Sequence, residues 1–203
     1  MNNKYSYTNL KNDTLPKIKQ FNQCDISEQF NPNGVKDMMV DFVFPPVIFP
    51  PNEIYKNFGK DNIIKMVFYH HNLLKKSSIK DLFTKDEDEF KTMTYRTADF
   101  FIEALGGGST YSSKHGHPHL RARHFTFTVD EHAREVWLMF YKKTLKDINF
   151  PKEYLKPFWE WIESLSIRMI NRRTTMNPPK RYPFEEVFKN IENNFFKGVS
   201  NEK

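Results

Sequence analysis

Apolar residues recur at intervals of three and four over long stretches of this 203-residue chain. The pattern is strongest over residues 128–148, where Asp130 is a residue type that favours helix N-termini, and over residues 151–173, which begin with Pro151. Gly is scarce, with 7 residues. The alternation of β-branched and polar residues that is typical of strands occurs only in short pieces. The spacing therefore predicts an all-α fold. The apolar face of 128–148 consists of Val136, Trp137, Phe140, Tyr141 and Leu145.

Further helices are predicted on both sides of these two. Asn52 is placed to begin a short helix, and a longer one is expected over residues 61–75, with Ile63, Val67 and Leu74 on one stripe. Residues 86–105 open with acids suited to a helix N-terminus and end at the glycines 106–108. A last helix is expected over about 183–196. The buried face of 86–105 is predicted to consist of Phe90, Met93, Thr97, Phe100 and Phe101.

The pattern divides the chain into three parts. Residues 1–51 are rich in Asn and Pro and read as an N-terminal extension, because paired prolines enforce extended backbone. Residues 52–173 hold the regular helical pattern and form the expected domain, and residues 174–203 form a C-terminal tail with a short helix. With 38% hydrophobic and 16% aromatic residues, the chain has enough apolar surface for one globular unit.

Charge and cysteine content bear on compartment and partners. The net charge is +6, but lysines are scattered among acids, which favours a solvated surface and no nucleic-acid partner. Cys24 is alone and cannot form an internal disulfide, and the N-terminus lacks the apolar core of a signal peptide, so we expect a cytoplasmic protein. The most apolar stretch, residues 40–51, is cut by prolines and too short to span a bilayer, so no membrane anchor is expected.

Four histidines cluster in the stretch HGHPHLRARH, residues 115–124. One hypothesis makes His115, His117 and His119 an alternating strip that binds zinc or nickel, but such a strip needs a strand, and Gly116 and Pro118 favour a loop. A second makes all of them polar loop residues. A third singles out His124, which follows a short helical turn and precedes an apolar run, as the single axial ligand of a haem.

The run GGGSTYSSKHGHPHLRARHFTFTVDEHAREVWL, residues 106–138, resembles the signature of the truncated haemoglobins of the second group. The match has no gap, and it departs from the pattern at Gly108, where Pro is usual, and at Glu135-Val136, where Asp-Ala is usual. A looser resemblance extends over about 52–173. The matching residues are Gly106, Gly107, Tyr111, Gly116, His117, Pro118, Leu120, Arg121, Arg123, His124, Phe127, Arg134, Trp137 and Leu138.

The resemblance implies a globin-like fold, a short helical sandwich of the truncated haemoglobin type with N- and C-terminal extensions, and haem b as cofactor. It makes His124 the proximal ligand of the iron and assigns Phe83 to the aromatic packed over the haem, with Tyr111 and Phe100 also in contact. Arg96 and Arg123 match positions suited to the haem propionates, since guanidinium groups pair well with carboxylates. Phe83 is equally compatible with an ordinary core residue, and Arg96 and Arg123 with ordinary surface residues.

On the distal side, the resemblance implies a pocket formed by Tyr69, Trp137, Thr97 and Met93. The indole of Trp137 can only donate, which suits a ligand with negative charge, although a plain core tryptophan looks the same in sequence. Thr97 is as well explained by a bond to its own helix. The separation between Tyr69 and Phe83 is one residue longer than usual, so His70 is the alternative distal residue.

These residues imply a globin that reversibly binds O2 and other diatomic ligands such as NO or CO, in oxygen binding or transport. Several distal donors also suit NO detoxification or peroxidase-like turnover, with a reductase as electron donor. The alternative from another class is a haem-based gas or redox sensor, or an interaction module, that uses the terminal extensions. A globin fold that has lost haem is disfavoured because His124 and Trp137 are intact.

Overall fold

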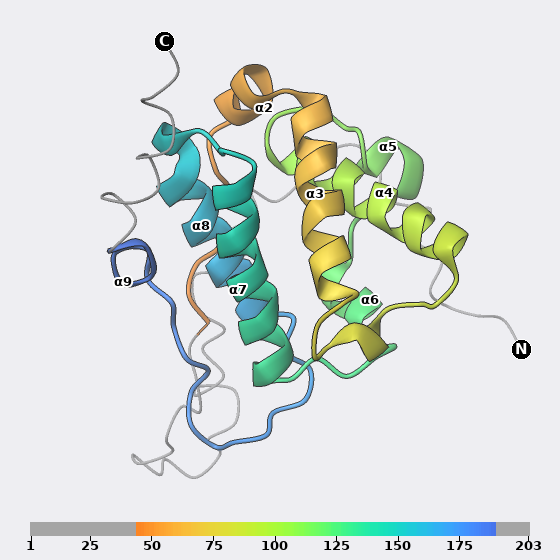
Figure 1. Cartoon of the computed structure of the whole chain (residues 1–203), viewed down its shortest axis with the longest axis vertical. Coiled ribbons are helices and arrows are strands. Elements are labelled where there is room, and N and C mark those ends of the chain that lie inside the picture. Colours follow the sequence, from red (N-terminus) through yellow and green to blue (C-terminus); the bar gives the residue numbers. More distant parts are fainter. Residues whose placement is uncertain (1–43, 190–203) are drawn as a thin grey trace, which may run out of the picture. The chain divides into compact units, whose positions relative to one another are not determined.

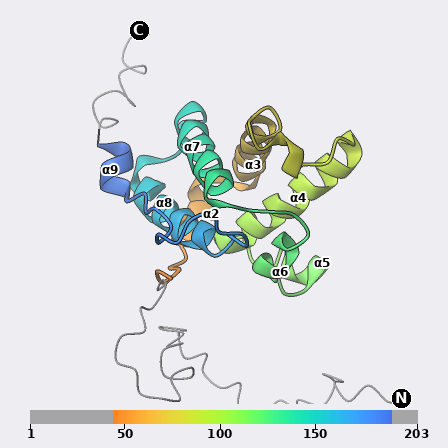
Figure 2. The ribbon, with the colours of Figure 1, turned by 90° about the horizontal axis from the view of Figure 1, so that it is seen from below.

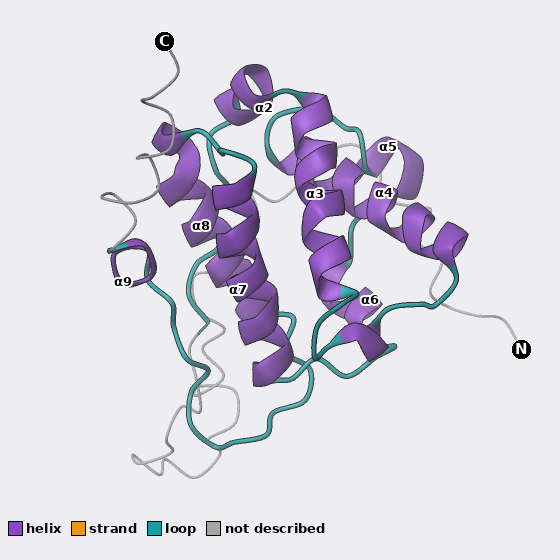
Figure 3. Cartoon of the chain, in the orientation of Figure 1, coloured by secondary structure: helices purple, strands orange, loops and turns teal. Residues whose placement is uncertain are grey.

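A computed structural model describes residues 44–189, and every element within that range is helical (Figures 1 and 3). The chain divides into two units, Met1–Pro46 and Val47–Lys203, and all the described helices belong to the second. The expected all-α class is confirmed. The helices are α2 (Glu53–Phe58), α3 (Lys60–Leu74), the 3-10 turn η1 (Lys80–Leu82), α4 (Glu87–Ala104), α5 (Ser112–His115), α6 (Leu120–His124), α7 (Glu131–Asp147), α8 (Lys152–Ile167) and α9 (Phe184–Phe188).

Four long helices make a sandwich of two pairs. Helix α3 packs against α4 on one side and against α7 on the other, and α7 packs against α8 (Figures 1 and 2). The predicted apolar stripe of α3 explains this packing, because Ile63, Val67 and Leu74 are all buried. The core between the pairs is strongly aromatic, with Tyr141 from α7 and Phe158 and Trp161 from α8 fully buried. This is the helical sandwich that the sequence predicted.

The helix ends follow from local chemistry. The Asp86 carboxylate accepts hydrogen bonds from the amides of Asp88 and Glu89, and Asp130 accepts one from Ala133, so both act as N-caps. Asn52 precedes α2 as predicted, but its side chain makes no capping bond. Helix α4 ends before Gly106, whose φ of 106° is a left-handed value, and a Cβ there would lie 2.4 Å from the Asn52 carbonyl oxygen. A glycine is therefore needed for both reasons.

Helix α8 ends at Ile167, six residues before the end of the predicted helical pattern. The cause is a competing set of hydrogen bonds. The backbone N–H of Asn171 donates to the Val129 carbonyl at 3.0 Å. The side-chain oxygen of Asn171 accepts a hydrogen bond from the backbone N–H of Val129 at 2.9 Å. The backbone at 168–171 therefore turns away from the helix axis to join the segment that follows α6.

The segment after residue 173 continues the packed unit. Phe188 in α9 is buried against Trp159, and the Trp159 indole donates to the Tyr182 carbonyl at 2.7 Å. The predicted tail helix begins as expected at residue 184, and residues 190–196 of that prediction lie outside the described range. The N-terminal extension lies outside it too, except for its last eight residues.

No helix in residues 44–189 is long and apolar enough to cross a membrane.

Candidate haem site

His124 ends the short helix α6, and its ring is held in one orientation. The Nδ1 atom lies 2.7 Å from the Leu120 carbonyl oxygen, one turn back along the helix. Because a carbonyl can only accept, Nδ1 carries the proton and Nε2 carries a lone pair. Among residues 44–189, Nε2 has no hydrogen-bond partner. This is the tautomer that a histidine needs in order to bind a metal through Nε2.

Asn171 fixes the loop that carries His124. Its side-chain amide donates to the carbonyls of His124, at 2.6 Å, and of Phe127, at 2.9 Å, while its oxygen accepts from Val129. One side chain thus closes both ends of the turn after α6. Sequence reasoning missed this residue, and the only signal available was an asparagine near a helix C-terminus.

The stretch between α4 and α6 is anchored to α4. The Glu103 carboxylate accepts hydrogen bonds from the amides of Tyr111 and Ser112, each at 2.8 Å. Asp99 forms an ion pair with Lys114 at 2.8 Å. Tyr111 is buried, and its ring lies edge-on to that of Phe100 with centroids 6.0 Å apart. The predicted contact residues Tyr111 and Phe100 therefore lie together between α4 and the start of α5.

The other histidines of the cluster do not form a metal strip. Helix α5 ends at His115, and His119 has a left-handed φ of 42°, so the segment is no strand. His117 accepts a hydrogen bond from the His119 amide, as loop residues do. Within residues 44–189 there is no group of three or more His, Cys, Asp or Glu residues able to hold a metal ion. A single histidine suffices for haem, because the porphyrin supplies the other ligands.

Tyr69 does not lie with the other predicted distal residues. Its hydroxyl donates to Asp147 at 2.6 Å, and its side chain is 37% exposed. That bond is the main reason why the pKa of Tyr69 is raised. The helical period explains this placement: Ile63, Val67 and Leu74 define the buried stripe of α3, and position 70 falls on it whereas position 69 does not. The longer spacing to Phe83 was the sequence signal for His70.

His70 and His71 are both buried where α3 faces α7 and Phe83. His70 Nε2 lies 3.0 Å from the Trp137 carbonyl oxygen, and its ring stacks on Tyr141 with centroids 3.6 Å apart. The donation to a carbonyl leaves the lone pair on Nδ1, which is buried and without a partner. Burial, and secondarily the neighbouring His71, hold the pKa of His70 well below its ordinary value.

His71 repeats the geometry of His124. Its Nδ1 lies 2.8 Å from the Val67 carbonyl oxygen, one turn back along α3, so its lone pair is also on Nε2. Its ring is edge-on to Phe83 with centroids 6.1 Å apart. Burial lowers the pKa of His71 to about 4, so the ring is neutral at pH 7. Sequence reasoning did not single out this residue.

Trp137 is the predicted distal residue with an available donor. Its ring is half-buried and stands perpendicular to His70, with centroids 5.4 Å apart. No hydrogen bond of its indole N–H is found within residues 44–189. Thr97 donates to the Met93 carbonyl at 3.1 Å, which is the local bond considered as its alternative explanation. Met93 and Thr97 are half-buried on α4.

The two arginines predicted to meet propionates are both exposed. Arg123 Nε donates to the Pro118 carbonyl at 2.9 Å, which leaves its terminal nitrogens available. No hydrogen bond or ion pair of Arg96 is found within residues 44–189. Phe83 is half-buried and belongs to the small apolar cluster that includes Leu74 and Val129.

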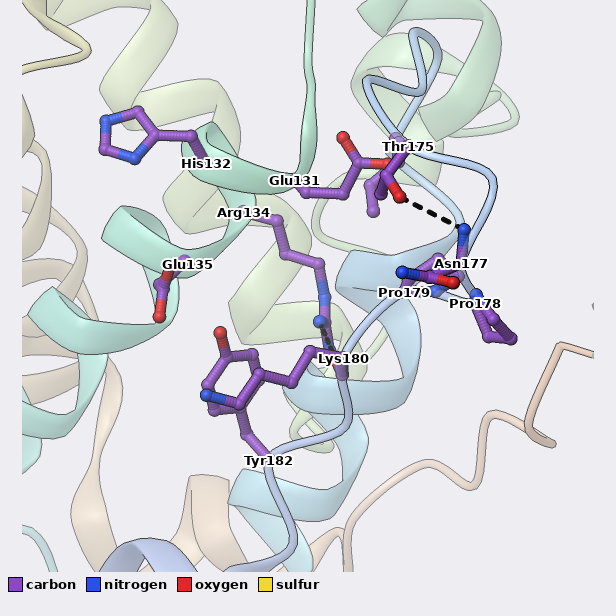
Figure 4. Close-up of a pocket in the computed structure, with 11 residues that line it drawn as sticks. Glu131, His132, Arg134, Glu135, Thr175, Asn177, Pro178, Pro179, Lys180 and Tyr182 are labelled. Atoms are coloured by element: carbon purple, nitrogen blue, oxygen red, sulfur yellow. Dashed lines mark hydrogen bonds between the residues drawn. The ribbon is translucent and has the colours of Figure 1, made fainter.

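A separate pocket of about 330 Å³ lies between the start of α7 and residues 175–182 (Figure 4). Arg134 points into this region, and its guanidinium donates to the Lys180 carbonyl, to Ser166 and to Glu163. Since these donors are already bound to protein groups, Arg134 ties the tail to the sandwich. The pocket is therefore a feature of that packing and not part of the site around His124.

A short helical sandwich with a histidine held by its own helix, and a tryptophan on the next long helix, is the arrangement of a globin. The chain belongs to the bacterial-like globin family, whose model matches residues 53–171. It is 25% identical over 122 residues to the group 2 truncated hemoglobin YjbI of Bacillus subtilis, a match that covers 60% of this chain and 90% of that protein.

Solved structures agree with this membership. The crystal structure of phosphate-bound Hell's gate globin IV is 47% identical and has a TM-score of 0.73, covering 75% of this chain and 96% of that one. The group II truncated hemoglobin from Bacillus anthracis has the same fold, with a TM-score of 0.56 at 24% identity, covering 60% of this chain and 98% of that one. The chain is thus a globin of the truncated hemoglobin type, a family that binds haem and, generally, a diatomic gas.

Proposed function

We propose that this globin holds haem b through His124 and reversibly binds O2, with NO and CO as further ligands. The observation that carries the proposal is the Nδ1 bond of His124 to the Leu120 carbonyl, which leaves a lone pair on Nε2. The same bond raises the basicity of the ring, because a hydrogen-bonded imidazole is a stronger donor to a metal. Haem supplies an iron that binds a diatomic gas and gives O2 partial negative charge.

The protein groups opposite His124 suit such a ligand. The Trp137 indole is a donor with no acceptor and no partner within residues 44–189, so it stabilises negative charge and cannot repel it. His70 and His71 are neutral at pH 7 because burial lowers their pKa values. Phe83 limits the access of water to the iron, and Met93 and Thr97 complete the distal wall. Arg96 and Arg123 are proposed to pair with the propionates.

The Trp137 donor favours tight binding of O2 over easy release. NO detoxification or peroxidase-like turnover, with a reductase as electron donor, is therefore the redox activity we propose to test first. A sensor role is the second candidate. It is supported by the contacts of residues 180–188 with α7 and α8, through which a change at the site would reach the tail.

The test is reconstitution of the purified protein with haem, followed by absorption and resonance Raman spectra. We expect a Soret band and an iron–histidine vibration, both of which His124→Ala should remove or strongly weaken. His117→Ala is the matched control, because His117 is exposed and bonds only to its own loop. Loss of ligation in the control, with His124→Ala unchanged, would refute the assignment.

A further inference from the structure

Two histidines of this chain are prepared in the same way for a metal. In His124 and in His71, Nδ1 donates to the carbonyl four residues earlier, at 2.7 and 2.8 Å, and Nε2 carries the lone pair. Neither Nε2 has a hydrogen-bond partner within residues 44–189. The His71 ring is buried and the His124 ring is half-buried, and each keeps one accepting nitrogen available for a further ligand.

The two histidines come from different elements, α3 and α6, which lie apart in Figure 2. The half-buried α4 residues Met93 and Thr97 belong to the proposed distal wall, and the ring next to His71 is Phe83, which is proposed to cover the haem. His71 therefore belongs to the distal side, whereas His124 belongs to the proximal side.

His70 is less suited to reach a metal. Its Nε2, at the tip of the ring, is engaged by the Trp137 carbonyl, and its ring is stacked on Tyr141. Its free lone pair is on Nδ1, close to the main chain, where Cβ hinders coordination. His70 instead fills the space between His71 and Trp137, with its centroid 5.5 Å from that of His71 and 5.4 Å from that of Trp137.

We propose that His71 is a second, internal ligand of the haem iron, so that in the absence of gas the iron is held by His124 and His71 together. The inference rests on the proposed haem ligation by His124. External ligands then compete with His71, and only the fraction of molecules in which His71 has left the iron can bind gas. The bond of His71 Nδ1 to the Val67 carbonyl leaves the Nε2 lone pair available.

The first experiment is spectroscopic and uses the full chain reconstituted with haem. Absorption, electron paramagnetic resonance and near-infrared magnetic circular dichroism of the ferric form should show a low-spin iron with two imidazole ligands. His71→Leu should convert it to a high-spin form, whereas the control Tyr69→Phe should remain low-spin. If His71→Leu fails to fold, labelling histidine with nitrogen-15 in the unaltered protein still tests whether two imidazole nitrogens couple to the iron.

The second experiment is CO binding to the ferrous form by rapid mixing. In the unaltered protein the observed rate should reach a plateau as CO increases, set by the departure of His71. In His71→Leu the rate should rise linearly with CO. At low CO it should exceed the rate of the unaltered protein by more than about tenfold if less than about a tenth of the unaltered protein has His71 off the iron at rest.

The outcomes separate this inference from the proposed function. A high-spin ferric iron in the unaltered protein, or a low-spin iron that survives His71→Leu, overturns the role of His71 and leaves ligation by His124 intact. Absence of any haem binding overturns both.

Discussion

At the scale of single residues, the site depends on which ring nitrogen holds the proton. Three histidines, His70, His71 and His124, each face a backbone carbonyl, and the carbonyl decides the tautomer because it can only accept. His124 and His71 present Nε2, whereas His70 presents Nδ1. Ligand chemistry on both sides of the proposed haem therefore follows from backbone geometry and not from residue type alone.

Trp137→Phe should increase the rate of O2 dissociation while changing CO dissociation far less. The indole N–H is the donor lost, and a hydrogen bond to a charged partner contributes about 1.5–3 kcal/mol, which corresponds to roughly tenfold to hundredfold faster release. Stopped-flow and flash-photolysis kinetics measure both rates. Tyr69→Phe is the matched control and should change neither, because its hydroxyl is bound to Asp147 at the surface. Equal, small effects of Trp137→Phe on both gases would show that the pocket lacks this donor.

Asn171→Ala should weaken haem retention, although Asn171 itself is not expected to contact the haem. The substitution removes three side-chain hydrogen bonds to His124, Phe127 and Val129, each contributing about 0.5–1.5 kcal/mol. We expect faster transfer of haem to an acceptor globin and a broadened iron–histidine vibration. Asn177→Ala, in an exposed loop, is the control and should behave like the unaltered protein. An unchanged vibration in Asn171→Ala would mean that α6 orients His124 without help from the loop.

At the scale of elements, a buried charge network joins α7, α8 and the segment before α9. Glu163 and Arg134 have side chains only 3% exposed and lie 2.7 Å apart, and Arg181 adds hydrogen bonds of 2.8–3.1 Å to the same carboxylate. Burial alone would raise the pKa of Glu163, but Arg181, the Tyr182 amide and Arg134 together hold it below its ordinary value. The tail is thus fastened to the sandwich by a carboxylate from α8.

Glu163→Gln should therefore lower the free energy of unfolding by about 3–5 kcal/mol, because it leaves the buried Arg134 without a charge partner. Arg181→Ala is the comparison and should lower the free energy of unfolding by less. In that variant Glu163 still forms its ion pair with Arg134, and the guanidinium of Arg181 is half-exposed. Urea unfolding monitored by circular dichroism measures both. Equal losses from the two variants would argue that Arg134 does not need Glu163.

The same network predicts a dependence on pH. A carboxylate whose pKa is lowered by folding stabilises the fold fully above its unfolded-state pKa, and this contribution disappears as the pH falls through the folded-state value. The ordinary pKa is 4.5, so the stability difference between the unaltered protein and Glu163→Gln should be largest above that pH and shrink below it. A difference that stays constant down to strongly acid pH would contradict this.

At the scale of the whole molecule, haem binding and folding are expected to be coupled. A ligand that binds only the folded state at about 100 times its Kd adds roughly 2.7 kcal/mol, which raises the Tm of a chain of this size by roughly 5–11 °C. Calorimetry with and without haem should show this shift, and His124→Ala should lose most of it. An unaltered chain with the same Tm in both conditions would mean that haem does not bind the folded state.

Much of the architecture follows from the sequence because helical periodicity is a local property. The apolar stripes of α3, α4 and α7 and the caps at Asp86 and Asp130 depend on neighbours within one or two turns. The gapless motif around His124 likewise identified the family and the proposed proximal ligand. Each of these features is decided by residues close together in the chain.

The tertiary structure decided what depends on contacts between distant segments. It turned Tyr69 outward to Asp147 and buried His70 and His71, because α3 is packed on two sides, by α4 and by α7. It ended α8 at Ile167 because Asn171 is bonded to the loop after α6, and it placed residues 180–188 in the packed unit through Glu163 and Trp159. Local propensity contains no term for partners 19 or more residues away, so only the folded chain could settle these positions.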